Sequence, residues 1–216
     1  MHKISEIQIG TDILKVNQKI AGEISKELKA HGIKSYEFMG SIGSGKTLLI
    51  EKIIEKLKAK GKRCGVIAGD VSGNDDYLRF VARGAQAVNV NTGKECHLDA
   101  HYIEHALEQL DLHSIDVLFI ENVGNLVCPS DFPLGADMRI VVISTTEGDD
   151  MVRKHPIIFA NADLAVLNKK DLAKYVDVDV NVILRDFQRI VPHKKILLTD
   201  AKHEEGIDEL MKEMGL

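Results

Sequence analysis

The stretch that decides the fold reads Gly40-Ser41-Ile42-Gly43-Ser44-Gly45-Lys46-Thr47. Residues 36–39 before it are typical of the end of a short strand, and residues 48–60 after it carry apolar side chains at helical spacing. Where a glycine-rich turn joins a strand to a helix in this way, backbone N–H groups and the helix N-terminus converge on phosphate oxygens. The sequence therefore predicts a P-loop that binds a nucleotide.

Two side chains of this loop have predicted tasks. Lys46 is expected to bridge the β- and γ-phosphates, and the Thr47 hydroxyl is expected to ligate Mg²⁺. A glycine turn that merely joins strand to helix is the alternative, but eight matching positions in the right context favour the P-loop. The nucleotide-binding residues predicted here are Gly40, Ser41, Gly43, Ser44, Gly45, Lys46, Thr47 and Leu48.

Length and composition are those of an ordinary globular protein. A chain of 216 residues with 44% apolar and 28% charged residues can bury a sizeable core in one domain. The formal net charge of −5 argues against a nucleic-acid or membrane partner, and no apolar run approaches the ~20 residues that span a bilayer. The chain opens with no signal-peptide pattern, and its three cysteines are too few for a disulfide framework. We therefore expect a cytoplasmic protein.

Strands and helices are expected to alternate beyond the P-loop. This order predicts an α/β fold, a mostly parallel, doubly wound sheet of a P-loop NTPase with helices on both faces. Residues 35–216 are expected to form the P-loop GTPase domain, and residues 1–34 an N-terminal helical extension, in a single domain overall. Strands are expected at about 63–70, 87–90, 116–121, 139–144, 164–167 and 195–198.

In the N-terminal extension, Thr11 or Asp12 is expected to cap a helix that runs to about Ala30. Packing against the domain is the favoured role of this helix, and docking of a partner is the alternative. The predicted apolar stripe consists of Ile13, Leu14, Ile20, Ile24 and Leu28.

Acidic residues follow two of the expected strands. Asp70 and Glu121 stand at the edge where ligands of a doubly wound sheet gather, so both are expected to hold Mg²⁺ together with Thr47. The loop after Asp70 is a candidate switch segment with an acidic pair, Asp75 and Asp76. One of the two is expected to hold the magnesium shell or the attacking water, and the alternative is that they cap a helix that begins near residue 77.

A second nucleotide motif, Asn168-Lys169-Lys170-Asp171, follows the strand at 164–167. The Asp171 carboxylate would accept hydrogen bonds from N1–H and the exocyclic amine of guanine, which adenine cannot supply. GTP and GDP are therefore the predicted nucleotides. The guanine-binding residues are Asn168, Lys169 and Asp171, with Ala201 and Lys202 in the loop that lines the base.

Thiols and imidazoles indicate a transition-metal site. His97 and His101 are four residues apart, which is ligand spacing on the helix expected to run to about Leu110. Cys96 is expected near the N-terminus of that helix, where the dipole favours the thiolate. Cys128 follows Glu121 by seven residues, and this ties a second thiol to the loop expected to sense the γ-phosphate.

Two alternatives concern these thiols. Cys64 lies inside an apolar run, so a small core side chain is the favoured interpretation there. Because Cys96 and Cys128 are 32 residues apart, the alternative to a metal site is a coincidence of surface side chains. Thiolate and imidazole suit both Zn²⁺ and Ni²⁺, so the ligand types do not decide the metal.

With these motifs in hand, the chain resembles the metallochaperone GTPases of the SIMIBI class, and within that class the branch that inserts nickel into hydrogenases. The most specific stretches are residues 92–101, 119–129 and 144–150. The resemblance implies that Cys96, His97 and Cys128 bind Ni²⁺ or Zn²⁺, with His101 as a further candidate ligand. It also implies that Asp76 rather than Asp75 is the acidic switch residue.

The resemblance further implies partners and a slow reaction. A GTP-dependent homodimer would hold the metal site at its interface, and a hydrogenase large-subunit precursor and a second nickel chaperone would be the other partners. The residues expected to serve hydrolysis are Lys46, Asp70, Asp76 and Glu121. Residues 121–124 offer no glutamine to orient water and no arginine finger is evident in cis, so slow turnover is predicted.

Two departures from the family pattern limit these expectations. Some members begin with a nickel-binding cysteine motif or a histidine-rich stretch, which this chain lacks, so a tight N-terminal nickel site is not predicted. The base-lining loop has Asp200 where serine is usual, which leaves its details open. The alternatives are a urease-type nickel GTPase, a chaperone of a cobalamin-dependent mutase, and a passive zinc- or nickel-binding protein with a structural nucleotide.

Overall fold

The computed structural model describes the backbone of residues 3–216 and the side chains of residues 12–216. The strands are β1 (Lys34–Gly40), β2 (Cys64–Asp70), β3 (Gln86–Asn91), β4 (Val117–Glu121), β5 (Met138–Ser144), β6 (Leu164–Asn168) and β7 (Lys195–Leu198). The helices are α1 (Lys3–Ala30), α2 (Lys46–Ala59), α3 (Asp75–Ala82), α4 (Ala100–Leu107), α5 (Met151–Lys154), α6 (Pro156–Asn161), α7 (Val180–Ile190) and α8 (Ile207–Glu213).

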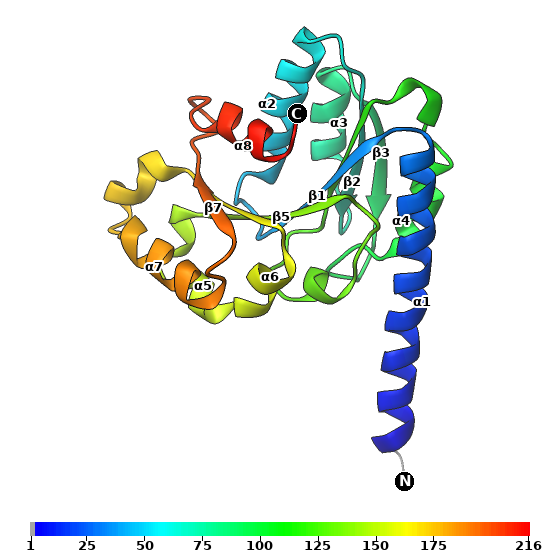
Figure 1. The fold of residues 1–216 in the computed structure, drawn as a ribbon, viewed down its shortest axis with the longest axis horizontal. Coiled ribbons are helices and arrows are strands. Elements are labelled where there is room, and N and C mark those ends of the chain that lie inside the picture. Colours follow the sequence, from blue (N-terminus) through cyan, green and yellow to red (C-terminus); the bar gives the residue numbers. More distant parts are fainter. Residues whose placement is uncertain (1–2) are drawn as a thin grey trace.

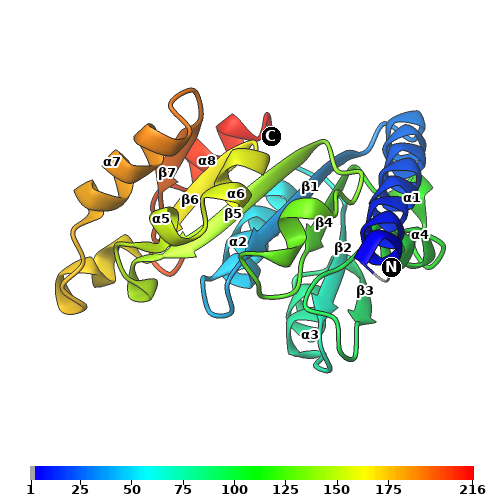
Figure 2. The ribbon, with the colours of Figure 1, turned by 90° about the horizontal axis from the view of Figure 1, so that it is seen from below.

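The strands form one sheet in the order β3-β2-β4-β1-β5-β6-β7, and every pair in it is parallel. Strand β1, labelled near the centre of Figure 1, lies between β4 and β5, as Figure 2 shows. The P-loop that follows β1 therefore leaves the centre of the carboxyl edge, next to the ends of β4 and β2. The predicted doubly wound sheet of a P-loop NTPase is confirmed, and its strands are all parallel.

Helices cover both faces of the sheet (Figure 2). On one face, α2, α3 and α8 bury a cluster that includes Leu49, Ile53 and Phe80. On the opposite face, α1 and α4 cover β2 and β4, and α5, α6 and α7 cover β5 and β6. Strands buried on both sides need continuous apolar runs, which explains why residues 117–120 and 140–143 are apolar throughout.

Helix α1 lies beside α4 at one edge of the molecule (Figures 1 and 2). It begins at Lys3, so Thr11 and Asp12 lie inside the helix and the predicted cap is wrong. Its second half packs as predicted, with Ile24 and Leu28 buried. Its first described turns do not follow the predicted stripe, because Ile13 is 53% exposed.

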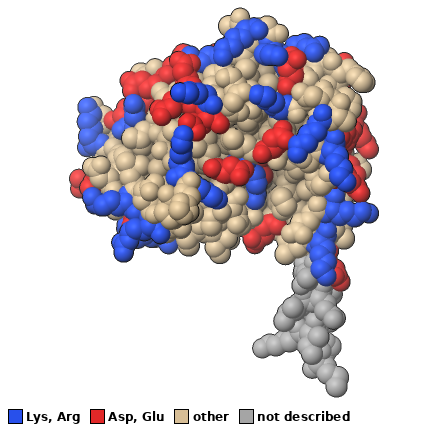
Figure 3. All heavy atoms as spheres, in the orientation of Figure 1, with Lys and Arg blue, Asp and Glu red and all other residues tan. Residues whose placement is uncertain are grey.

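The surface shown in Figure 3 carries acidic and basic side chains interspersed over the same face. Among the helices of residues 3–216, none combines the length and the apolarity that a bilayer crossing requires.

Candidate functional site

The P-loop keeps its shape through glycines and through the bonds of Lys46. Gly40 has a φ of 147°, and a Cβ there would lie 2.1 Å from the carbonyl oxygen of Val142. Gly45 has a φ of 97° at the start of α2, and a Cβ there would lie 2.3 Å from Asn168 Nδ2. Lys46 Nζ lies 3.1 Å from the carbonyl oxygens of Gly40 and Ser41, to which it donates. Burial lowers the pKa of Lys46, because the ammonium has lost most of its water, while the nearby carboxylates of Glu121, Asp76 and Glu147 oppose that shift.

A cavity of about 360 Å³ opens beside this loop. The Thr47 hydroxyl donates to Glu121 Oε1 at 2.9 Å, and the second carboxylate oxygen of Glu121 is buried without a hydrogen-bond partner. Asp70 also lines the cavity, and its carboxylate accepts from the backbone N–H of Val71 at 2.6 Å. Burial raises the pKa of Glu121 to about 7. Two carboxylates and a hydroxyl are oxygen ligands of the kind that Mg²⁺ takes, so these residues fit that ion.

The acidic pair after β2 lies in the first turn of α3, because the helix begins at Asp75 and not near residue 77. Asn74, rather than either aspartate, stands at the N-cap position. Asp76 lines the cavity and contributes to the electrostatic field around Lys46 and Glu121. The geometry therefore places Asp76 in the lining of the cavity beside the P-loop, and its role as the acidic switch residue stays a prediction.

The guanine motif contacts the P-loop directly. Asn168 donates from Nδ2 to the carbonyl oxygen of Ser44 at 3.0 Å, and its Oδ1 accepts from the backbone N–H of Ala201 at 3.2 Å. Lys169 has a φ of 58°, and its Nζ donates to the carbonyl oxygen of Gly43 at 2.6 Å. The motif, the base-lining loop and the phosphate cradle are thus one connected unit, although 124 residues separate Ser44 from Asn168.

The departure at Asp200 has a structural explanation. Its carboxylate is buried and accepts from the backbone N–H of His203 at 3.1 Å, with the His203 ring against its second oxygen. The backbone of Asp200 also pairs with that of Glu205 at 3.0 Å in both directions. Asp200 therefore closes the turn that presents Ala201 and the exposed Lys202.

Cys96, His97 and Cys128 come together at the surface. Their ligand atoms all lie within 4.8 Å of one another, with 2.9 Å between the two sulfurs and 4.0 Å between Cys96 Sγ and His97 Nδ1. Burial lowers the pKa of His97, which favours the neutral imidazole that binds metals. Contact with the Cys96 thiol and burial raise the pKa of Cys128. Two sulfurs and one imidazole make a three-ligand set that fits Zn²⁺ or Ni²⁺.

The loop that carries Cys128 touches both sites. Asn125 donates its backbone N–H to the carbonyl oxygen of Gly40 at 2.9 Å, and its Nδ2 to the carbonyl oxygen of Cys96 at 3.2 Å. Its Oδ1 accepts from the backbone N–H of Val127 at 2.8 Å. One residue therefore joins the P-loop, through its backbone, to the segments that carry Cys96 and Cys128, through its side chain.

The model of the family described as "CobW/HypB/UreG, nucleotide-binding domain" matches residues 35–198. The chain belongs to the CobW/HypB/UreG family.

Individual members of the CobW/HypB/UreG family are similar over most of their length. The probable hydrogenase maturation factor HypB of Methanocaldococcus jannaschii is 53% identical over 212 residues, which is 98% of this chain and 96% of that one. The crystal structure of hydrogenase maturation factor HypB from Archaeoglobus fulgidus matches with a TM-score of 0.86 at 44% identity, covering 93% and 98% of the two chains. HypB from Helicobacter pylori, solved in complex with nickel, matches with a TM-score of 0.85 at 35% identity, covering 92% and 95%.

One predicted ligand lies apart from the thiol cluster of this CobW/HypB/UreG domain. Helix α4 begins at Ala100, where Asp99 caps it by accepting from the backbone N–H of Tyr102, so His97 precedes the helix. The expected one-turn spacing of His97 and His101 is therefore wrong. The His101 ring instead faces His105, with their Nε2 atoms 3.3 Å apart.

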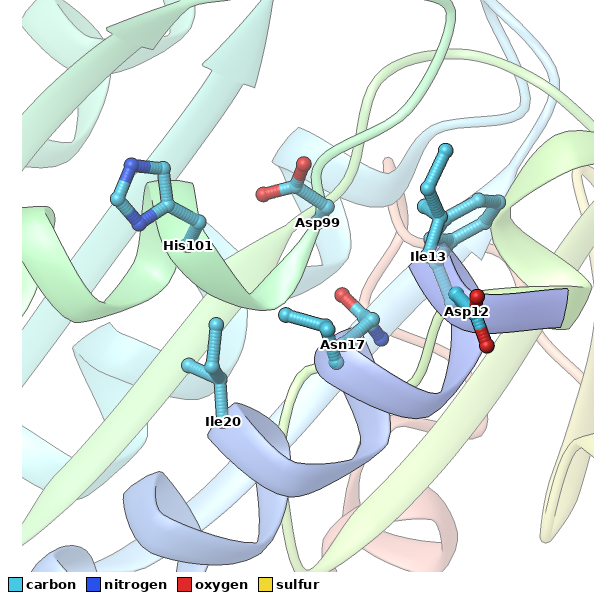
Figure 4. Close-up of a pocket in the computed structure, with 8 residues that line it drawn as sticks. Asp12, Ile13, Asn17, Ile20, Asp99 and His101 are labelled. Carbon is cyan, nitrogen blue, oxygen red and sulfur yellow. The ribbon is translucent and has the colours of Figure 1, made fainter. Parts of the chain in front are cut away.

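A second cavity, of about 350 Å³, lies between α1 and the start of α4 (Figure 4). Ile13 and Ile20 of α1 line it opposite His101. Phe132 lines it too, and its ring packs against His97 with 4.2 Å between the ring centroids. In this family member, the helical extension thus reaches the neighbourhood of the thiol cluster.

Two charged residues near the P-loop were not predicted from the sequence. Arg79 of α3 lines the phosphate cavity, although no arginine was expected there in cis. Its guanidinium bonds to the buried Glu51 and lies 3.5 Å from Asp76. Burial raises the pKa of Glu147, and Ser41 and Lys46 of the P-loop partly oppose that shift. Glu147 could have been suspected from its capping-box spacing to Ser144, but its approach to the P-loop is a tertiary contact.

Proposed function

We propose that this chain is a metal-binding GTPase that couples GTP binding and hydrolysis to nickel delivery during [NiFe]-hydrogenase maturation. The observation that carries the proposal is the segment 121–128. It begins at a carboxylate bonded to Thr47, passes through Asn125, which is bonded to both Gly40 and Cys96, and ends at Cys128 of the thiol cluster. A change at the phosphate end therefore has a short covalent and hydrogen-bonded path to the metal ligands.

In this proposal, hydrogen bonds within the P-loop are replaced by bonds to phosphate when the nucleotide binds. Lys46 would release the carbonyl oxygens of Gly40 and Ser41 and bind the β- and γ-phosphates, while Thr47, Asp70 and Glu121 would hold Mg²⁺. When bound, Mg²⁺ would neutralise charge on the phosphate oxygens. Asp76 would orient the attacking water from the first turn of α3. Turnover would be slow because Arg79, the arginine that lines the cavity, is held by Glu51.

The metal would be cargo. Cys96, His97 and Cys128 would hold Ni²⁺, or Zn²⁺ in its place, with a position left open for release or for a ligand from a second chain. The relative from Helicobacter pylori was solved in complex with nickel, which supports nickel as the metal. The partners would be a second copy in a GTP-dependent homodimer, a hydrogenase large-subunit precursor and a second nickel chaperone, all in the cytoplasm.

Two measurements on the purified chain test the proposal. Nickel titrations in the presence of GDP and of a GTP analogue should give one site per chain with different affinities in the two states. GTP turnover should be slow but measurable, and it should vanish in Lys46→Ala while it persists in Lys60→Ala at the exposed end of the same helix. Equal nickel affinities would overturn the coupling, turnover that survives Lys46→Ala would show that the P-loop is not its source, and the absence of turnover would leave only a passive metal-binding protein.

A further inference from the structure

Glu37 is a buried carboxylate that takes no part in the sites described above. Through its hydrogen-bond partners it is connected to both segments of the thiol cluster, the one with Cys96 and His97 and the one with Cys128. Glu37 of β1 is 0% exposed and stands three residues before Gly40. Its Oε1 accepts from Asn122 Nδ2 at 2.8 Å, and its Oε2 accepts from Arg139 Nε at 2.9 Å. A buried charge is tolerated when it is paired and hydrogen-bonded in this way, so the three side chains form one unit.

The first arm of this unit holds the segment of Cys96 and His97. Asn122 Oδ1 accepts from the backbone N–H of Leu98 at 2.9 Å, and Leu98 directly follows His97. The Leu98 side chain is itself fully buried. The same Asn122 oxygen accepts from the backbone N–H of Val123 at 2.9 Å, which fixes the amide with respect to the end of β4.

The second arm holds the segment of Cys128. The Arg139 guanidinium donates to the carbonyl oxygen of Pro129 at 2.5 Å and to that of Ser130 at 3.3 Å. These are the two residues that follow Cys128. Asn161 donates to the Ser130 carbonyl as well, at 3.2 Å, so the carbonyl group is fixed from two sides.

We propose that Glu37 and Arg139 are positioning residues for metal binding, which hold the two ligand segments at a fixed separation from the strand that carries the P-loop. The inference rests on the proposed function, because it assumes that Cys96, His97 and Cys128 bind the metal. It extends that function in a specific way. Asn122 also lines the phosphate cavity, so Glu37 joins the nucleotide end and both ligand segments through one carboxylate.

The test uses the full chain with Arg139→Lys, which keeps a positive charge near Glu37 and loses the forked donor that reaches two carbonyl oxygens. Residues behind metal ligands typically affect affinity 10- to 100-fold, and we expect Ni²⁺ affinity, measured by competition with a chelator, to fall in that range. The absorption bands of bound Co²⁺ should shift, while GDP affinity stays within about twofold of the unaltered chain. The control is Asp186→Asn, which breaks the ion pair of Asp186 with Arg153 and should leave the affinity and the bands unchanged.

A second variant and a metal-independent readout cover the case in which Arg139→Lys does not fold. Glu37→Gln combined with Arg139→Gln removes both charges and keeps amide hydrogen-bonding groups, and its Ni²⁺ affinity should fall in the same range. In both variants, oxidised glutathione should close the Cys96–Cys128 disulfide more slowly than in the unaltered chain, because the sulfurs are no longer held 2.9 Å apart.

The outcomes separate this inference from the proposed function. Folded variants with unaltered nickel affinity, Co²⁺ bands and disulfide closure would overturn the positioning role and leave the proposed function standing. An unaltered chain that binds no metal at the three ligands would overturn both.

Discussion

Glu121 is the residue at which the phosphate site is most sensitive to pH. Its carboxylate is 4% exposed, and only one of its two oxygens has a hydrogen-bond partner, the Thr47 hydroxyl. Burial raises its pKa from 4.5 to about 7, so the folded chain keeps this proton to higher pH than the unfolded chain does. The contribution of this bound proton to the stability of the fold is complete below pH 4.5 and is lost as the pH rises through 7.

We therefore predict that Glu121→Gln stabilises the chain at pH 8 in the absence of Mg²⁺. By linkage, the free energy of unfolding of the unaltered chain should fall by about 2.5 kcal/mol from this group between pH 5 and pH 8, and glutamine has no proton to lose. Urea unfolding of both chains at pH 5 and pH 8 measures the difference. Parallel changes in the two chains would show that Glu121 is already ionised at pH 5.

A second prediction at this scale concerns the thiols. Cys96→Ala and Cys128→Ala should each weaken Ni²⁺ binding by more than the 10- to 100-fold typical of residues behind a ligand, because they remove a ligand itself. GDP affinity should not change, since neither thiol lines the phosphate cavity. Metal analysis and calorimetry with GDP measure both quantities. The matched control is Cys64→Ala, which alters a buried core thiol and should leave nickel binding intact.

At the scale of elements, Asn17 is the joint between α1 and the rest of the domain. It is 5% exposed, its Oδ1 accepts from the backbone N–H of Ala100 at 2.7 Å, and its Nδ2 donates to the carbonyl oxygen of Pro133 at 2.9 Å. Asn17 thus supplies a partner to the first N–H of α4 beside the Asp99 cap.

Asn17→Ala should destabilise the fold by about 2 kcal/mol, because it leaves the buried N–H of Ala100 and the half-buried carbonyl of Pro133 unpaired. Urea unfolding monitored by circular dichroism measures the loss. Val16→Ala, on the same turn but at a side chain that is 58% exposed, should change the stability by less than about 0.5 kcal/mol. A loss in Val16→Ala as large as in Asn17→Ala would mean that the whole turn, and not the asparagine, supports the joint.

Strands were more predictable than helix starts. The apolar runs that end at Asp70 and Glu121 marked β2 and β4 correctly, because a strand buried on both faces has few other possible interpretations. Helix starts were placed late at α1 and α3 and early at α4, since short polar residues that can cap occur at several positions near each start. The error at α4 affected the prediction of the metal ligands, because it put His97 and His101 on one helical turn.

What remained hidden were the pairings between distant segments. Glu37 and Arg139 are 102 positions apart in the chain. Each is a charged residue between apolar residues of its own strand, so nothing in the sequence indicates that the two form a pair. The approach of Asn125 to Cys96 is of the same kind. Sequence motifs reveal residues whose role depends on residues close to them in the chain. The roles of Glu37, Arg139 and Asn125 depend on residues that only the order of the strands brings close.

At the scale of the whole molecule, the sheet order explains why the proposed nucleotide and metal sites lie close to each other. Strands β2, β4 and β1 are consecutive in the sheet, so the loops that follow Asp70, Glu121 and Gly40 leave the same edge. Strand β6 lies on the other side of β1 and β5, and its loop reaches the P-loop at Ser44. The nucleotide would thus be held between the loops that follow β1, β2 and β4 and the loop that follows β6. The thiol cluster lies on the side of β2, β3 and β4, because Cys96 and His97 follow β3 and Cys128 follows β4.

The last prediction follows from the number of ligands. One chain offers three ligands in a cluster at its surface, and a tetrahedral metal needs a fourth. A second copy related by a two-fold axis would bring its own three ligands against the first three, so the two copies together would supply enough ligands to complete a shared four-coordinate site. Because the γ-phosphate would order the loops at 71–76 and 121–128, we expect light scattering to show a doubled mass with a GTP analogue and Ni²⁺, and the monomer mass with GDP alone. Cys96→Ala combined with Cys128→Ala should still bind the analogue but should lose the part of the dimerisation that depends on nickel. A single monomer mass in every condition would confine the switch to one chain, and the fourth ligand would then have to come from water or from the recipient of the metal.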